Sequence, residues 1–151
     1  MSTVDDADRV DLDEVVTEFQ GHMSLMFTRA RSLWRESAAM VHPDLQPSGY
    51  KLLTHIARVG SSNAHQLSEC FEMDKSAISR QVRMLEDAGL IESRPDESDG
   101  RLRVLTATAA ARDLLATVRN HHSNRIRTAI SGLTPDEMRV ASMVFSRLAE
   151  I

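Results

Sequence analysis

Cysteine, long apolar runs and enzyme motifs are scarce in this sequence, and each shortage excludes a class of protein. Cys70 is the only cysteine among 151 residues, so no disulfide can form within one chain, which fits a reducing compartment. No apolar run reaches the roughly 18 residues that a membrane-spanning helix needs, and no basic, apolar leader is evident. We therefore expect a cytoplasmic protein that does not insert into a membrane.

The sequence also has no Gly-rich phosphate loop, no nucleophile elbow and no clustered metal-ligand spacing. His121 and His122 are adjacent, so on a helix they point about 100° apart and cannot chelate an ion as an i, i+4 pair does. We expect no enzyme, no metal and no cofactor. With 42% hydrophobic residues the chain can bury a core, and we interpret residues 1–151 as one domain.

A helix is predicted to begin at Asp74 and to end at Gly89, which suits the left-handed position after a helix. Ile78, Val82 and Leu85 recur at helical spacing and form one apolar stripe. Short hydroxyls and guanidinium groups on the opposite face suit the major groove of DNA, where arginine can bond two acceptors on guanine. The residues of that polar face, with the lysine at the helix start, are Lys75, Ser76, Ser79, Arg80, Arg83 and Asp87.

The segment after this helix predicts a β-hairpin, or wing. LIESR and RLRVL are runs of strand type, and the PDESDG between them consists of turn residues. Because side chains alternate along a strand, Arg101 and Arg103 are expected on a face that meets phosphate, and Leu102 and Val104 on a face that packs. Asp99 is expected to hold Arg101 extended through a short ion pair.

Three helices are predicted before Asp74. The first runs from Leu12 to about Val41, after residues 1–11, which are expected to fray, and it is too long for a small domain to cover. Pro47 suits the start of the second, which stops at Gly60. Asn63 and Gln66 indicate a capping box for the third, whose expected buried residues are Leu67, Cys70 and Phe71. The third helix and the helix at Asp74 form a helix-turn-helix pattern.

Two helices are predicted after the wing. Thr108 is placed to cap the first, which ends at Gly132, and Thr134-Pro135-Asp136-Glu137 combines the features of a helix start.

Net charge is −4, and residues 65–106 hold six Lys and Arg against nine Asp and Glu. A few arginines therefore carry the positive field, which predicts modest non-specific affinity for DNA and strong dependence on a few phosphate contacts.

This order of elements resembles the MarR family of bacterial transcription regulators (multiple antibiotic resistance regulators). The most specific part is DKSAISRQVRMLEDAGLIESRPDESDGR, which includes the Asp-x-Arg signature at Asp99 and Arg101; LTPDE also resembles the family. The chain departs from the family at Ala107-Thr108, where Leu-Thr is common, and at Ala111, where glycine is usual.

The resemblance implies a mainly α fold with a small β wing: a winged helix-turn-helix lobe at residues 45–106 and dimerisation helices at residues 12–42 and 108–151. It implies a homodimeric, ligand-responsive repressor that binds double-stranded DNA, and a twofold dimer predicts an inverted-repeat operator. The expected DNA-binding residues are Lys75, Ser76, Ser79, Arg80, Arg83, Asp99, Arg101 and Arg103. Family members bind small aromatic effectors between the dimer helices and the lobe, and the corresponding candidates are His22, Met26, Arg29, Trp34 and Tyr50.

Two alternatives stay open. The acidic lobe favours a winged-helix protein-interaction module that has lost DNA binding. A thiol redox sensor would use Cys70, although its neighbours Leu67 and Phe71 favour a small buried hydrophobic residue at that position.

Overall fold

The computed structural model describes the backbone of residues 3–151 and the side chains of residues 11–151. In this part of the chain the elements are α1 (Thr3–Val41), α2 (Pro47–Val59), α3 (Ala64–Phe71), α4 (Lys75–Asp87), β1 (Ile91–Pro95), β2 (Arg103–Ala107), α5 (Ala109–Ala129) and α6 (Pro135–Leu148). The strands pair antiparallel, so the predicted mainly helical fold with a small β wing is confirmed. The chain divides into two compact units, residues 1–115 and residues 116–151.

Helix α1 is longer than the sequence predicted. It begins at Thr3 and not at Leu12, so the predicted start of the helix is wrong. Residues 1 and 2 lie outside the described residues. No proline or glycine precedes Leu12, so nothing in the sequence stops the helix from extending. The predicted end before Pro43 is confirmed, because α1 ends at Val41.

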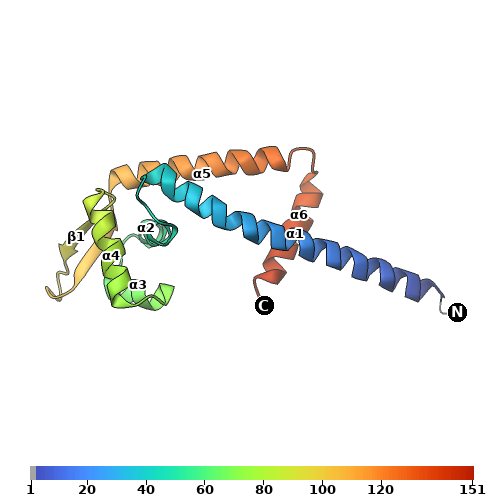
Figure 1. Cartoon of the computed structure of the whole chain (residues 1–151), viewed down its shortest axis with the longest axis horizontal. Coiled ribbons are helices and arrows are strands. Elements are labelled where there is room, and N and C mark those ends of the chain that lie inside the picture. Colours follow the sequence, from blue (N-terminus) through green and yellow to red (C-terminus); the bar gives the residue numbers. More distant parts are fainter. Residues whose placement is uncertain (1–2) are drawn as a thin grey trace. The chain divides into compact units, whose positions relative to one another are not determined.

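The two ends of α1 have different surroundings. Ser37, Ala38 and Val41 are buried, which places the last turns of the helix in the core around α2. Figure 1 shows the rest of α1 extending away from α2, α3 and α4 toward the N-terminus. The exposed apolar side chains along this extension are Leu12, Val15, Val16, Phe19, Leu25, Met26, Phe27 and Leu33. An apolar stripe of this length is typical of a helix that packs against a partner.

The core of the lobe (residues 45–106) forms where α2, α3, α4 and β2 meet. Its fully buried large side chains are Leu52, Leu53, Ile56, Leu67, Ile78, Leu85 and Leu105. Burial of each such side chain stabilises the fold by about 1.5–3 kcal/mol. Helix α2 begins at Pro47 and stops at Gly60, whose φ of 90° suits a residue without a Cβ atom, and both bounds are as predicted.

Helix α3 forms half of the predicted capping box. Asn63 Oδ1 accepts a hydrogen bond from the Gln66 backbone N–H at 2.9 Å, whereas Gln66 Oε1 accepts from the Ser62 hydroxyl at 3.4 Å. Ser62 and Leu105 also exchange two backbone N–H···O bonds, of 3.0 and 2.8 Å. These two bonds hold the residues just before α3 against the edge of β2, and so they place the start of α3 beside the wing.

The prediction that Cys70 is buried is wrong, because its side chain is exposed. Leu67 is fully buried, and the half-buried Phe71 ring meets the His55 ring edge-on with centroids 5.3 Å apart. Helix α3 has only eight residues, and its packed stripe runs along Leu67 and Phe71. Cys70 points about 100° away from Phe71, which turns it out of that narrow stripe.

The junction of α4, the wing and α5 is closed by hydrogen bonds. Leu90 N–H donates to Leu85 O and Gly89 N–H to Glu86 O, both at 2.9 Å, and Gly89 has a φ of 71°. This is the helix-ending arrangement that the sequence predicted at Gly89. Thr108 caps α5, as predicted, by accepting from Ala111 N–H at 3.1 Å, and its hydroxyl donates to Gly89 O at 2.8 Å.

Residues 116–151 contain the second half of α5 and all of α6. Gly132, with a φ of 98°, follows α5 as predicted. Thr134 and Glu137 form the complete capping box expected from the sequence, with N–H···O distances of 2.7 and 3.2 Å. No side chain of α6 is buried in the described structure, and Val140, Met143 and Phe145 are exposed.

Candidate nucleic-acid interface

Helix α4 presents the predicted polar face to solvent. Ile78 and Leu85 are fully buried and Val82 is half-buried, so the apolar stripe holds the helix against the lobe. The Asp74 carboxylate accepts from Ala77 N–H at 2.7 Å and caps the first turn. The exposed side chains of the outer face are Lys75, Ser76, Ser79, Arg80 and Arg83. Hydroxyl, ammonium and guanidinium groups on one exposed helix face are suited to bond base edges and phosphates.

The wing packs on the face opposite to the one predicted. Strand β2 begins at Arg103, so Arg101 and Leu102 belong to the turn. Alternation along β2 places Arg103 on the same face as the buried Leu105. The prediction that Leu102 and Val104 form the packed face is wrong, because Leu102 is 43% exposed and Val104 lies on the other side of the strand from Leu105.

Two hydrogen bonds from Arg103 to Ser93 define this face of the wing. Arg103 Nε donates to Ser93 Oγ at 2.8 Å, and an Arg103 terminal nitrogen donates to Ser93 O at 2.9 Å. Ser93 pairs directly with Leu105 in the register, so Arg103 reaches diagonally across the strand pair. Sequence reasoning missed Ser93. Its spacing from Arg103 becomes informative only when the strand register is known.

Asp99 holds the backbone of the wing turn and not the guanidinium of Arg101. Asp99 Oδ1 accepts from Arg101 N–H at 3.1 Å, and Asp99 O accepts from Leu102 N–H at 3.0 Å. Across the described residues no ion pair joins Asp99 to the Arg101 side chain, so the predicted ion pair is wrong. An aspartate in a turn readily accepts from the amide two residues on, and this local bond competes with the longer reach to the guanidinium.

Asp96 organises the other half of the wing turn. Its Oδ1 accepts from the Ser98 hydroxyl at 2.6 Å, from Ser98 N–H at 2.8 Å and from Asp99 N–H at 3.1 Å. The Ser98 hydroxyl, followed by these two amides, lowers the pKa of the Asp96 carboxyl because each bond favours the charged form. Asp96 N–H donates to Leu102 O at 2.9 Å and extends the hairpin beyond β1.

Three predicted arginines surround one hollow of about 470 Å³, which we call the wing hollow. It is lined by residues 63–65 before and at the start of α3, by one side of α4, and by the wing. Arg83 of α4 lies on one wall, and Arg101 and Arg103 of the wing lie on another. Sequence reasoning missed His65, which also lines the wing hollow and whose Nε2 is 3.2 Å from Glu69 Oε1.

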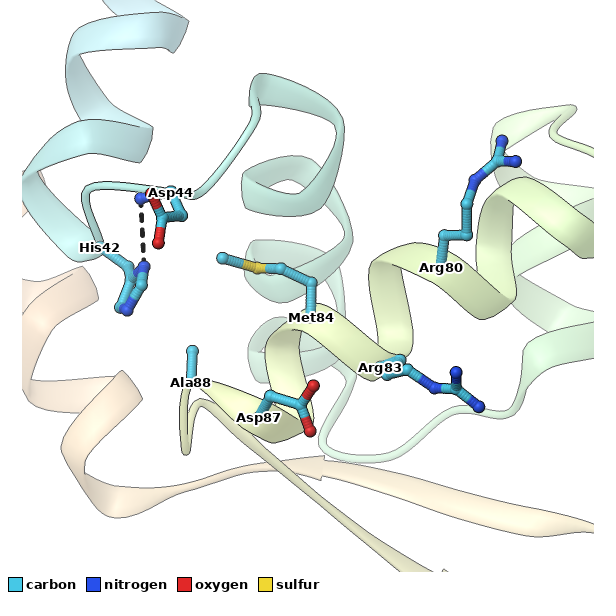
Figure 2. Close-up of a pocket in the computed structure, with 7 residues that line it drawn as sticks. All are labelled: His42, Asp44, Arg80, Arg83, Met84, Asp87 and Ala88. Carbon is cyan, nitrogen blue, oxygen red and sulfur yellow. Dashed lines mark hydrogen bonds between the residues drawn. The ribbon is translucent and has the colours of Figure 1, made fainter.

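A second hollow of about 450 Å³ lies beside the C-terminal half of α4 (Figure 2). Met84 extends toward His42 and Asp44, and Asp44 N–H donates to His42 Nδ1 at 3.2 Å. The guanidinium groups of Arg80 and Arg83 extend away from that pair. Arg83 therefore borders both hollows.

The structure brings together two of the five effector-pocket candidates. The Trp34 and Tyr50 rings meet edge-on with centroids 5.7 Å apart, and Lys51 Nζ lies 5.1 Å from the Trp34 centroid. Met26 and Arg29 lie on α1 at about 12 and 7.5 Å along the helix axis from Trp34, and His22 lies further still. His22, Met26 and Arg29 share a face of α1 that points about 120° away from Trp34.

The described residues show neither a metal-binding cluster nor a membrane-spanning helix. Among them no three His, Cys, Asp or Glu side chains are grouped so that they could hold a metal ion. None of the described helices combines the length and hydropathy that spanning a membrane requires.

The arrangement of α3, α4 and the wing defines the class of this protein. Two short helices joined by a turn, the second with an exposed polar face and followed by a two-stranded hairpin, form a winged helix-turn-helix. Residues 44–102 match the model of the MarR family. Over these residues the chain is similar to the MarR family of winged helix-turn-helix transcription regulators.

Relatives support this assignment over most of the chain. The HTH-type transcriptional regulator YxaD of Bacillus subtilis (strain 168) is 26% identical over 118 residues, covering 78% of this chain and 82% of YxaD. The crystal structure of YusO from Bacillus subtilis has a TM-score of 0.75 at 22% identity, covering 91% of this chain and 96% of YusO. FabT of Streptococcus pneumoniae, solved in complex with DNA, has a TM-score of 0.75 at 16% identity, covering 89% and 95%.

Proposed function

We propose that this chain is a homodimeric repressor that reads an inverted-repeat operator in double-stranded DNA and is released by a small aromatic ligand. The observation that carries the DNA part is the outer face of α4, where Ser76, Ser79, Arg80 and Arg83 are exposed above a buried apolar stripe. The fold that FabT shares was solved with DNA bound, which supports the same use here. Arg101 and Arg103 on the wing would add contacts to the backbone or the minor groove.

The exposed apolar side chains support the dimer. In residues 11–36 they run along α1, and in residues 116–151 they include Ile126, Val140, Met143 and Phe145. Exposed stripes of this kind are stabilised when they pack against a second copy. A twofold dimer would place two α4 helices in successive major grooves, about 10 base pairs apart, which is why we expect an inverted repeat.

The test of the DNA part begins with genomic footprinting of the bound protein, which identifies the operator. Arg80→Ala and Arg83→Ala are then titrated against cognate and scrambled duplexes at two salt concentrations, with Arg119→Ala on α5 as the matched control. An arginine that pairs with a base should cost about 1–3 kcal/mol on the cognate duplex only. An arginine that contacts phosphate should weaken both duplexes alike. If both variants remain folded dimers and neither changes affinity, the protein-interaction alternative replaces the DNA-reading role.

The ligand part rests on the contact of Trp34, Tyr50 and Lys51. Two aromatic rings beside one ammonium group suit an aromatic anion, which would stack on the rings and pair with the charge. Ligand binding would lower DNA affinity by the difference in ligand affinity between the DNA-free and DNA-bound states.

Trp34 is the only tryptophan, so its fluorescence reports this site directly. Titration with benzoate should quench that fluorescence and weaken operator binding in the same concentration range. Lys51→Met should lose both effects. Quenching without any change in operator affinity would mean that the site binds benzoate but does not regulate DNA binding, which would contradict the ligand response.

The exposure of Cys70 favours a thiol-based response as a second candidate. Cys70→Ser should abolish any effect of peroxide on operator binding if that candidate holds. An equal response of Cys70→Ser and the parent protein would exclude it.

A further inference from the structure

The face of the wing that carries Ser93 and Arg103 opens into the wing hollow. Both residues line it, and Arg83 lines it from α4. The walls therefore belong to two elements that a winged helix-turn-helix sends into neighbouring grooves of DNA. Between two such grooves runs one sugar-phosphate strand. The wing hollow is the place where that strand would pass.

Ser93 fixes the direction of one cation in this hollow. An arginine side chain carries five N–H donors. Ser93 takes two of them, through Oγ at 2.8 Å and through its carbonyl at 2.9 Å. Three N–H groups of Arg103 are left for an incoming anion. A guanidinium that is already held along one edge loses less conformational entropy when it binds than a free one does.

The charge around the hollow favours an anion over a base edge. Arg83, Arg101 and Arg103 line it together, and the hydroxyl of Ser79 adds a donor. His65 also lines it, but its Nε2 is 3.2 Å from Glu69 Oε1. Glu86 is the acidic residue on the α4 wall, so the lining keeps an excess of cations. Several guanidinium groups lining one hollow suit the tetrahedral oxygens of a phosphate, which accept several charge-assisted hydrogen bonds at once.

We propose that Ser93 is a positioning residue, which orients Arg103 so that it and Arg83 clamp a backbone phosphate of the DNA strand passing between α4 and the wing. This inference rests on the proposed DNA-binding function and adds a role for a residue that makes no contact with a base. Arg103 supplies the positive charge, and Ser93 determines the direction in which the Arg103 side chain points.

The salt dependence of binding distinguishes these two properties. Binding of a mixed-sequence duplex is measured by fluorescence anisotropy over a salt series, so that no operator is needed. Arg103→Gln should lower the slope of log K against log salt by about 0.9, because one phosphate contact is lost. Ser93→Ala removes the Oγ acceptor but keeps the carbonyl acceptor and the charge of Arg103. It should weaken binding about 2- to 10-fold with an unchanged slope, as expected when a long side chain that is held less firmly must be immobilised on binding.

Two further variants test whether Ser93 acts through Arg103. Ser93→Thr keeps the hydroxyl and suits a strand, so it should restore parental affinity. Ser93→Ala should cost nothing more when combined with Arg103→Gln. Arg94→Gln, which removes an exposed arginine from the other face of the wing, controls for generic charge loss and should remain additive with Ser93→Ala.

Each outcome decides between the proposals. If the parent protein binds neither this duplex nor an operator identified by footprinting, the proposed function fails. If it binds and the loss from Ser93→Ala persists in the Arg103→Gln background, or Ser93→Thr does not rescue, the positioning role fails while DNA binding stands. Inorganic phosphate at matched ionic strength should not displace the duplex. If phosphate displaces the duplex from the parent protein but not from Arg103→Gln, the hollow binds a free anion, and the assignment to the DNA strand is wrong.

Discussion

At the scale of single residues, the wing turn depends on carboxylates that accept backbone hydrogen bonds. Asp96 and Asp99 each accept from an amide two residues further on. An aspartate in this position closes a turn and brings a negative charge toward the same surface as the arginines. These two effects oppose one another in DNA binding, and they can be separated by substitution.

Asp99→Asn and Asp99→Ala should have different effects on DNA affinity. Asparagine keeps the Oδ1 acceptor for Arg101 N–H while removing the charge, so binding should stay equal or tighten. Alanine removes the acceptor as well, so the turn should loosen and binding should weaken. Anisotropy titrations on one duplex compare the two variants. Tighter binding by Asp99→Ala would mean that repulsion outweighs the turn.

Asp96 gives the turn a defined pH dependence. Its pKa is lowered in the folded state, so its contribution to stability is complete above the unfolded pKa and is lost as pH falls through the folded value. Carboxyl carbon shifts in an NMR titration should show Asp96 titrating below the ordinary range of an aspartate. Ser98→Ala should raise that pKa, because the Ser98 hydroxyl is the largest cause of the shift. Glu97→Gln in the same turn is the control and should leave the titration of Asp96 in place.

At the scale of elements, local chemistry made most boundaries predictable. Helices begin or end at the predicted caps and glycines, which are Asp74, Thr134, Gly60 and Gly89. These positions are predictable because a cap or a positive φ requires particular residue types within a few positions. Periodicity alone could not show where the wing turn ends. Apolar and basic residues alternate from Arg101 to Val104, but Leu102 lies in the turn and not in β2. The alternation therefore predicted the wrong packed face for β2.

Cys70 and Ser93 show a second limit of the sequence. The width of the buried stripe on α3 depends on what packs against it, and an eight-residue helix buries only Leu67 completely. The bond between Ser93 and Arg103 depends on the pairing of two strands across a turn, which composition does not specify. Contacts of this kind become visible only in three dimensions.

Thr108 joins three elements, so its hydroxyl should matter more than that of an ordinary cap. It accepts from Ala111 N–H in α5 and donates to Gly89 O after α4. Thr108→Val keeps the shape and removes both bonds, and should lower the free energy of unfolding by about 1–2 kcal/mol. Thr108→Ser should retain most of the stability. Urea unfolding monitored by circular dichroism compares the variants, and parental stability of Thr108→Val would show that these bonds are dispensable.

At the scale of the whole molecule, we propose that a second copy of the chain covers the exposed apolar side chains. Phe145 is 52% exposed on α6, and no side chain of α6 is buried in the described structure. A monomer would leave these groups in water, whereas a dimer would bury them at the benefit that apolar burial normally brings. The same dimer would let two lobes bind the two half-sites of one operator. DNA affinity would therefore depend on the oligomeric state.

Phe145→Glu should dissociate the dimer without unfolding the protomer. The introduced carboxylate is tolerated at an exposed position but is costly when buried without a partner. Sedimentation should then give the mass of one chain, with helical content unchanged. Operator affinity should fall roughly 100- to 10,000-fold, because the second half-site is no longer bound at the effective concentration that linkage provides. Ser146→Glu, at the neighbouring exposed position, is the matched control and should remain a dimer. A dimer of Phe145→Glu with full operator affinity would remove α6 from the interface and leave the extended part of α1 as the surface that joins the two copies.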